Sequence, residues 1–189
     1  MTLRDHGIYF LFIFAFYIFQ NLILFPLENS FRTDNFADIA SMVYLPHGMK
    51  ILYGIILGPI SFIYILAAQF LSGVMFLGFD ETVFIGSIFG SVAIVVPVML
   101  LNASSNKPVL SAPADYMNTQ LSIIWTYMSL AIFTSLLSVY LHDFLYGQAR
   151  QEIHIFMFAG DIVGALTILA LFLFIYRPLM NRIILGKHN

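Results

Sequence analysis

Three ionisable side chains within apolar stretches of this sequence are its strongest candidates for chemistry. Asp161 lies eight residues into the last apolar run, about 12 Å deep at ~1.5 Å per helical residue. A carboxylate at that depth costs several kcal/mol unless it is paired or hydrated, so it marks a functional site by default. The alternative is structural: a hydrogen-bonded Asp161 would hold neighbouring helices together.

His47 and Lys50 form the other half of the candidate site. They are three residues apart, so they share one helical face if a helix begins near Pro46. If the chain enters this stretch from outside near Ile39, His47 lies as deep as Asp161. Opposite charges at matching depth predict a pair of Asp161 with His47 or Lys50, lining a cavity reached from the outer face. Alternatively, Lys50 extends to the interface and His47 only caps a helix.

Other polar residues are weaker candidates. Gln69, in the middle of an apolar run, either extends the ligand-binding cluster or makes one interhelical hydrogen bond. His142, Asp143 and His154 form an incomplete metal constellation that is more typical of a solvated surface, so we expect no metal site. Whether the protein holds a cofactor is unknown from the sequence. The sequence has no GxSxG, no phosphate-binding glycine loop, no helical zinc spacing and no cysteine, so we expect no enzymatic activity.

The composition indicates that these residues are positioned inside a membrane. The chain is 60% hydrophobic and 10% charged, whereas soluble domains carry roughly 25% charged residues. The eight Lys and Arg residues are scattered, so nucleic acid is excluded as a partner. We expect a lipid bilayer, a membrane or cytoplasmic protein partner, and a small-molecule ligand.

A bilayer core of ~30 Å requires roughly 20 apolar residues per helix. The second of six such segments is interrupted by Pro46-His47-Gly48, and broken backbone is tolerated only inside protein or beside a wet cavity. We therefore predict one all-α domain over residues 1–189, a polytopic membrane helix bundle of about six segments with the second broken near Pro46. A five-span arrangement with a re-entrant second segment remains open. The predicted segments are 7–26, 38–57, 60–79, 82–101, 120–141 and 153–176.

The placement of Lys and Arg predicts the orientation, because cytoplasmic loops carry the excess. With six spans, Arg32 and Arg150 lie outside, and five basic residues lie inside. This predicts a cytoplasmic C-terminus. We also expect the membrane to be a bacterial inner membrane. The inside residues are Arg4, Lys107, Arg177, Arg182 and Lys187.

Three GxxxG patterns permit close approach of helices. They fall in the second, fourth and sixth segments, which predicts that these helices meet near the core within one chain. The six glycines are Gly54, Gly58, Gly86, Gly90, Gly160 and Gly164.

Two short motifs in the sequence resemble motifs of a known protein family. Leu45-Pro46-His47-Gly48 resembles the Trp-Pro-x-x-Gly-like break of MASE-type bacterial integral membrane sensor domains, and Gly160-Asp161-Ile162-Val163-Gly164 resembles their Gly-Asp-x-x-Gly motif. The resemblance implies a sensory or partner-binding module, usually fused to a kinase or a cyclic-dinucleotide enzyme. Leu45 stands where the family has an aromatic residue, Lys50 has no counterpart, and the family usually has more spans.

Two other functions fit the sequence. Substrate-binding subunits of energy-coupling-factor vitamin transporters are also small and six-helical, with a pocket under a first extracellular loop placed like residues 28–46. Their first helix often carries small residues four apart, whereas this one offers only Ala15. The third function is a non-catalytic accessory subunit of a larger membrane complex.

Overall fold

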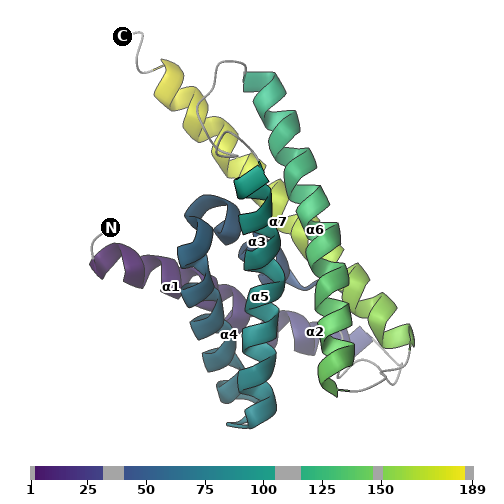
Figure 1. Cartoon of the computed structure of the whole chain (residues 1–189). Helices are drawn as coiled ribbons and strands as arrows, with labels where there is room; N and C mark the ends of the chain where they lie inside the picture. Colours follow the sequence, from purple (N-terminus) through teal and green to yellow (C-terminus); the bar gives the residue numbers. More distant parts are fainter. Residues whose placement is uncertain (1–2, 32–40, 105–115, 147–150, 186–189) are drawn as a thin grey trace.

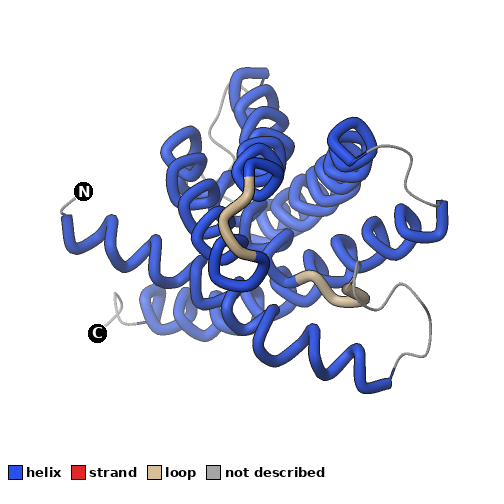
Figure 2. The backbone as a smooth tube through the Cα atoms, turned by 90° about the horizontal axis from the view of Figure 1, so that it is seen from below, coloured by secondary structure: helices blue, strands red, loops and turns tan. Residues whose placement is uncertain are grey.

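The computed structural model describes residues 3–31, 41–104, 116–146 and 151–185. Within these ranges every regular element is helical and no strand occurs (Figures 1 and 2), so the predicted all-α class is confirmed. The elements are α1 (Leu3–Phe19), the π-helical turn η1 (Gln20–Leu24), α2 (Phe25–Phe31), α3 (Leu45–Leu57), the 3₁₀ turn η2 (Gly58–Ile60), α4 (Ser61–Leu77), α5 (Glu81–Ser104), α6 (Tyr116–Tyr146) and α7 (Gln151–Leu185).

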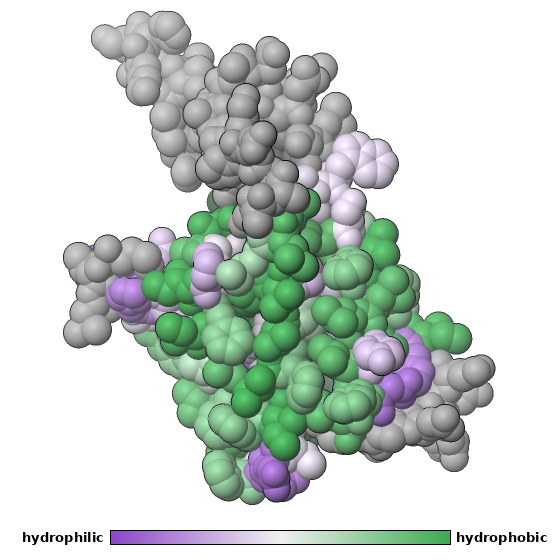
Figure 3. Space-filling view, viewed as in Figure 1, coloured by the Kyte–Doolittle hydropathy of each residue, from purple (hydrophilic) through white to green (hydrophobic). Residues whose placement is uncertain are grey.

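Five helical stretches of the described chain are long and apolar enough to cross a membrane, which supports an integral membrane protein. The visible surface of the described residues is mostly apolar, with hydrophilic side chains near its edges (Figure 3). Lipid is the solvent that such a surface requires. A sixth span is not confirmed. The five stretches are Arg4–Phe31, Leu45–Leu77, Glu81–Leu101, Ile124–Leu145 and Ile153–Ile175.

The span that is not confirmed is the predicted segment 38–57. Residues 38–40 lie outside the described part, residues 41–44 are not helical, and α3 has only 13 residues, which at ~1.5 Å each give about 20 Å. The chain then reverses at Gly58, whose φ of 60° is left-handed, followed by Pro59. Lys50 and Gln69 lie on opposite sides of this turn in the sequence, yet both line one cavity. Leu45–Leu77 is therefore two helices joined by a turn.

Helix α3 is the central element of the bundle. It contacts α1, α4, α5, α6 and α7, and nine of its thirteen residues are buried. Its contacts with α7 advance together along both segments, because the N–H of Tyr44 donates to the carbonyl of Gly160 at 2.9 Å while Gly48 lies against Ala165. α3 and α7 therefore run parallel, and the start of α3 lies beside the segment that carries Asp161.

Proline and glycine explain why α3 starts where it does. Pro46 occupies the first turn of α3, where a backbone N–H would have no intrahelical acceptor, so proline loses no hydrogen bond there. A Cβ on Gly160 or Gly164 would overlap the carbonyl of Ser41 or Tyr44, respectively. These two glycines thus let the non-helical residues 41–44, here called the strap, lie directly on α7.

The other GxxxG glycines behave differently from one another. Gly54 faces Val98 of α5, and Gly90 faces the side chain of Gln69 on α4. The carbonyl of Gly86 accepts a hydrogen bond from Gln69 Nε2 at 3.4 Å. Gly58 has no described atom within 4 Å of a would-be Cβ, so it serves the turn and not helix packing.

Candidate functional site

The start of α3 and the first turns of α7 bring His47 and Asp161 together. Nδ1 of His47 lies 3.3 Å from Oδ2 of Asp161. The two residues are only 1% and 6% exposed, so both lie almost completely inside the protein. At this low exposure a charged or polar group is stable only when its neighbours satisfy it.

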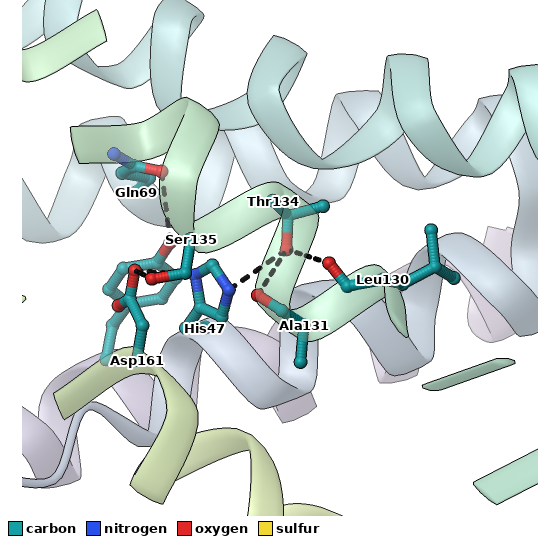
Figure 4. A network of polar contacts seen from close by, with 8 residues as sticks. His47, Gln69, Leu130, Ala131, Thr134, Ser135 and Asp161 are labelled. Carbon is teal, nitrogen blue, oxygen red and sulfur yellow. Dashed lines mark hydrogen bonds and ion pairs between the residues drawn. The ribbon is translucent and has the colours of Figure 1, made fainter. Parts of the chain in front are cut away.

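Helix α6 supplies those neighbours (Figure 4). Ser135 Oγ donates to Oδ2 of Asp161 at 3.0 Å. Nε2 of His47 lies 3.1 Å from Oγ1 of Thr134, whose hydroxyl donates to the carbonyl of Leu130 at 2.7 Å. Both ring nitrogens of His47 therefore have a hydrogen-bonding partner, and the ring is held in one orientation.

The arrangement of aspartate, histidine and hydroxyl is the order of a nucleophilic triad. Thr134 is fully buried and is not among the side chains that line the neighbouring cavity. Its proton is directed to the backbone of its own helix. Thr134 therefore orients His47 and does not present a nucleophile to a molecule in the cavity.

Lys50, one turn after His47, belongs to a second group of polar contacts. Its Nζ lies 5.6 Å from the ring centroid of Tyr44, within cation–π range. The Tyr17 hydroxyl donates to Oε1 of Gln69 at 3.1 Å, and Tyr17 and Tyr44 both line the neighbouring cavity. Lys50 and Gln69 are therefore each in contact with a tyrosine of that cavity.

The strap is fixed by two side chains from the first helical stretch. The Glu28 carboxylate accepts the N–H groups of Met42 at 2.7 Å and Val43 at 2.9 Å. Gln20, which begins the π-helical turn, donates to Ser41 Oγ at 2.9 Å and accepts from the N–H of Leu45 at 3.1 Å. π-turns are frequent at functional sites, and this one directs a buried amide at the start of α3.

A cavity of about 440 Å³ lies beside both groups. Its polar wall is formed by Tyr17, Gln20, Ser41, His47, Lys50, Gln69 and Asp161. Apolar side chains line it toward the end of the bundle that carries the α4–α5 turn, here called the Asp80 end: Phe76, Leu77, Val83, Leu141, Leu145 and Met157. The space is therefore amphipathic, with His47, Lys50 and Asp161 at one end and mainly apolar side chains, together with His142, toward the other.

All four predicted ligand-binding residues line this one cavity. His47 contacts Asp161 directly, whereas Lys50 contacts Tyr44 and Gln69 contacts Tyr17. Of the weaker candidates, His142 lines the cavity, while Asp143 and His154 form an ion pair of 2.6 Å with each other.

Several site residues were not singled out from the sequence. Gln20 carries the same signal as Gln69, a lone amide within an apolar run, and could have been found by it. Thr134 and Ser135 are adjacent small hydroxyls in the middle of a span, a common pattern with little specificity. Glu28 gave no signal, because an acid after the first span is ordinary for an outer loop.

Comparison with protein-family models, with curated protein sequences and with solved structures finds no match to this chain.

Proposed function

We propose that this chain is an integral membrane binding module that holds a small molecule in the cavity beside His47, Lys50 and Asp161 and passes the bound state to a protein partner. The observation that carries the proposal is the cavity itself. Its volume of about 440 Å³ falls within the ~300–1,000 Å³ of small-molecule sites, which are mostly apolar with a few directed polar groups.

A sensory role is supported by the contact between the two motifs that resemble those of the sensor domains. Gly164 lies against the backbone of Tyr44 and Leu45, and Gly48 lies against Ala165. The Pro-His-Gly break and the Gly-Asp motif therefore form one contact next to the cavity. A ligand touching His47 and Asp161 would change the packing of α3 on α7, and α7 would carry that change along its length.

The topology that fits this role has six passes, the second made by the short helix α3. The cavity would then lie in the outer half of the bilayer, with the Asp80 end outside and the end of α7 in the cytoplasm of a bacterium. The chain has no cysteine, so single-cysteine variants give clean labelling. An impermeant maleimide should label Asp80→Cys in intact cells and label Arg182→Cys only after lysis; the reverse pattern contradicts this orientation.

The binding role is tested by filling the cavity. Ser138 lines it, so Ser138→Phe should block it, whereas Ser129→Phe adds the same bulk at an exposed position of the same helix. Native mass spectrometry of protein purified in non-ionic detergent should find a small molecule retained by the wild type and by Ser129→Phe. Ser138→Phe should lose it while keeping its folding transition. Retention by Ser138→Phe, or no bound molecule in any of the three proteins, would overturn the proposal.

The strap favours a second candidate, a substrate-binding subunit of an energy-coupling-factor-type transporter. Ser41 and Tyr44 of the strap line the cavity, which matches a pocket under a first extracellular loop. The two functions differ in whether the ligand crosses the membrane. Uptake of the molecule found by mass spectrometry into cells expressing the chain favours transport, and its retention outside favours sensing.

A further inference from the structure

The Lys50 ammonium makes no salt bridge with a carboxylate among the described residues, although Asp161 acts on it electrostatically. Lys50 is 3% exposed and lines the cavity, with its Nζ over the Tyr44 ring. Among the described residues no carboxylate lies within ion-pair distance of that Nζ; Asp161 pairs with His47. The ring face of Tyr44 offers partial compensation for an ammonium, less than a full negative charge does.

His47 and Asp161 together carry no net charge. Nε2 of His47 faces Thr134 Oγ1. With the Thr134 proton directed to Leu130, we assign the hydrogen of the His47–Thr134 contact to Nε2. Nδ1 and the Asp161 oxygen then share one proton. Whether that proton rests on nitrogen or on oxygen, the sum of the pair is zero.

The cavity wall therefore holds one positive charge in excess, at Lys50. A buried ammonium is stable only with a counter-charge or with hydrogen bonds that replace water. The wall around Lys50 holds the neutral Tyr17 and Tyr44 hydroxyls and the neutral amide of Gln69. It also holds Asp161, whose charge is offset by the proton that it shares with His47. One cation beside neutral donors suits a monoanion such as a carboxylate. A phosphate group would require several cations or N–H groups.

The opposite end of the cavity is lined mainly by apolar side chains and also carries His142. Six apolar side chains lead from the polar wall toward the Asp80 end, and burial of apolar surface there contributes ~25 cal/mol per Å². Resting on the proposed binding function, we propose that the ligand is an amphipathic carboxylate. Its carboxylate lies at Lys50, and its apolar body extends toward the Asp80 end.

The test compares head groups on one hydrocarbon chain. Affinities of the full chain in non-ionic detergent are measured by thermal stabilisation with decanoate, decanol and decyltrimethylammonium. A second arm uses the water-soluble pair phenylpropionate and phenylpropanol. Decanoate alone binding identifies a fatty acid drawn from the bilayer, and phenylpropionate binding identifies an organic acid from water; both have the proposed chemistry.

Lys50→Met removes the charge at similar volume, Lys50→Arg keeps it, and Arg4→Met removes a cation far from the cavity. In the wild type, Lys50→Arg and Arg4→Met, the carboxylate should bind about tenfold to a hundredfold tighter than the alcohol, as expected for a charged hydrogen bond. In Lys50→Met this preference should fall to about twofold or less. If Lys50→Met does not fold, the wild-type preference of carboxylate over alcohol alone decides.

Equal binding of carboxylate and alcohol, or a preference unchanged by Lys50→Met, overturns the anionic ligand while leaving the cavity as a binding site. Tighter binding of decyltrimethylammonium does the same. A cavity that retains no molecule in the Ser138→Phe comparison removes the proposed function, and this inference with it.

Discussion

Removal of the Asp161 carboxylate would leave two buried groups without a partner. Nδ1 of His47 lies 3.3 Å and Oγ of Ser135 lies 3.0 Å from the same Asp161 oxygen. The His47 and Ser135 side chains are 1% and 0% exposed. Asp161→Ala therefore removes the one carboxylate oxygen that both side chains contact.

The expected loss follows from what each contact is. Removing one partner of a buried ion pair costs ~3–5 kcal/mol in soluble proteins, whereas an interhelical hydrogen bond in a membrane protein averages ~0.6 kcal/mol. The contact of Asp161 with His47 lies between these two kinds, because the pair shares one proton, and its contact with Ser135 is a hydrogen bond. We therefore expect Asp161→Ala to lower the free energy of unfolding by about 3 kcal/mol and Ser135→Ala by about 0.6 kcal/mol.

The measurement is reversible unfolding of the purified protein in mixed detergent and denaturing surfactant, followed by circular dichroism. Val163→Ala is the matched control, because Val163 lies on the same helix and is 41% exposed. Its effect should stay below about 0.5 kcal/mol. The double variant His47→Ala with Asp161→Ala should lose less than the sum of the single losses, by about 1–2 kcal/mol for residues in contact.

Two results would refute this reasoning. An Asp161→Ala protein as stable as Val163→Ala would mean that the carboxylate makes no contact that matters to folding. Additive losses in the double variant would mean that His47 and Asp161 act independently, and the shared proton on which the charge balance of the cavity rests would be wrong.

Three further predictions concern the strap, the glycine contacts and the α4–α5 turn. Glu28→Gln leaves one carbonyl oxygen for two strap N–H groups, so hydrogen exchange at those amides should accelerate about tenfold, as expected for one lost hydrogen bond; unchanged exchange contradicts the contact. Gly164→Ala should destabilise by about 1–3 kcal/mol through overlap with a strap carbonyl, while Gly7→Ala, with no described atom within 4 Å, should be neutral or stabilising in thermal unfolding. The Thr82 hydroxyl and the next backbone N–H hold the pKa of Asp80 below its ordinary value, a contribution to stability present at neutral pH and lost as pH falls through that pKa. Thr82→Ala should raise the pKa of Asp80 in an NMR titration of its carboxyl carbon, and an unchanged titration would assign the shift elsewhere.

The helical bundle was predictable because hydropathy alone identifies stretches that must bury backbone polar groups in helices. Boundaries agree where polar residues end an apolar run, as at α4 and α5. α6 and α7 extend beyond the predicted 120–141 and 153–176, because a helix continues past the hydrocarbon as long as its backbone groups pair internally. Hydropathy therefore predicts the length of the membrane-spanning part of a helix and not the full length of the helix.

The form of the second segment was not predictable in the same way. Met42, Val43 and Tyr44 are as compatible with a helix as with the extended strap. The strap is fixed by Glu28 and by Gly160 and Gly164 on α7, both far away in sequence. A local pattern indicates that a helix breaks at Pro46, but a distant carboxylate and two distant glycines decide what precedes the break.

The depth of the ionisable groups was predictable because it follows from the number of residues between each group and the start of its apolar segment. His47 and Asp161 lie at the same depth because α3 and α7 run parallel. Because the two helices are also adjacent, these side chains lie close together. Lys50, one turn further along α3, lines the cavity and makes no salt bridge with that carboxylate, although the two groups interact electrostatically. The same spacing that pairs His47 therefore leaves Lys50 available, which is why the ligand is expected to supply the missing negative charge.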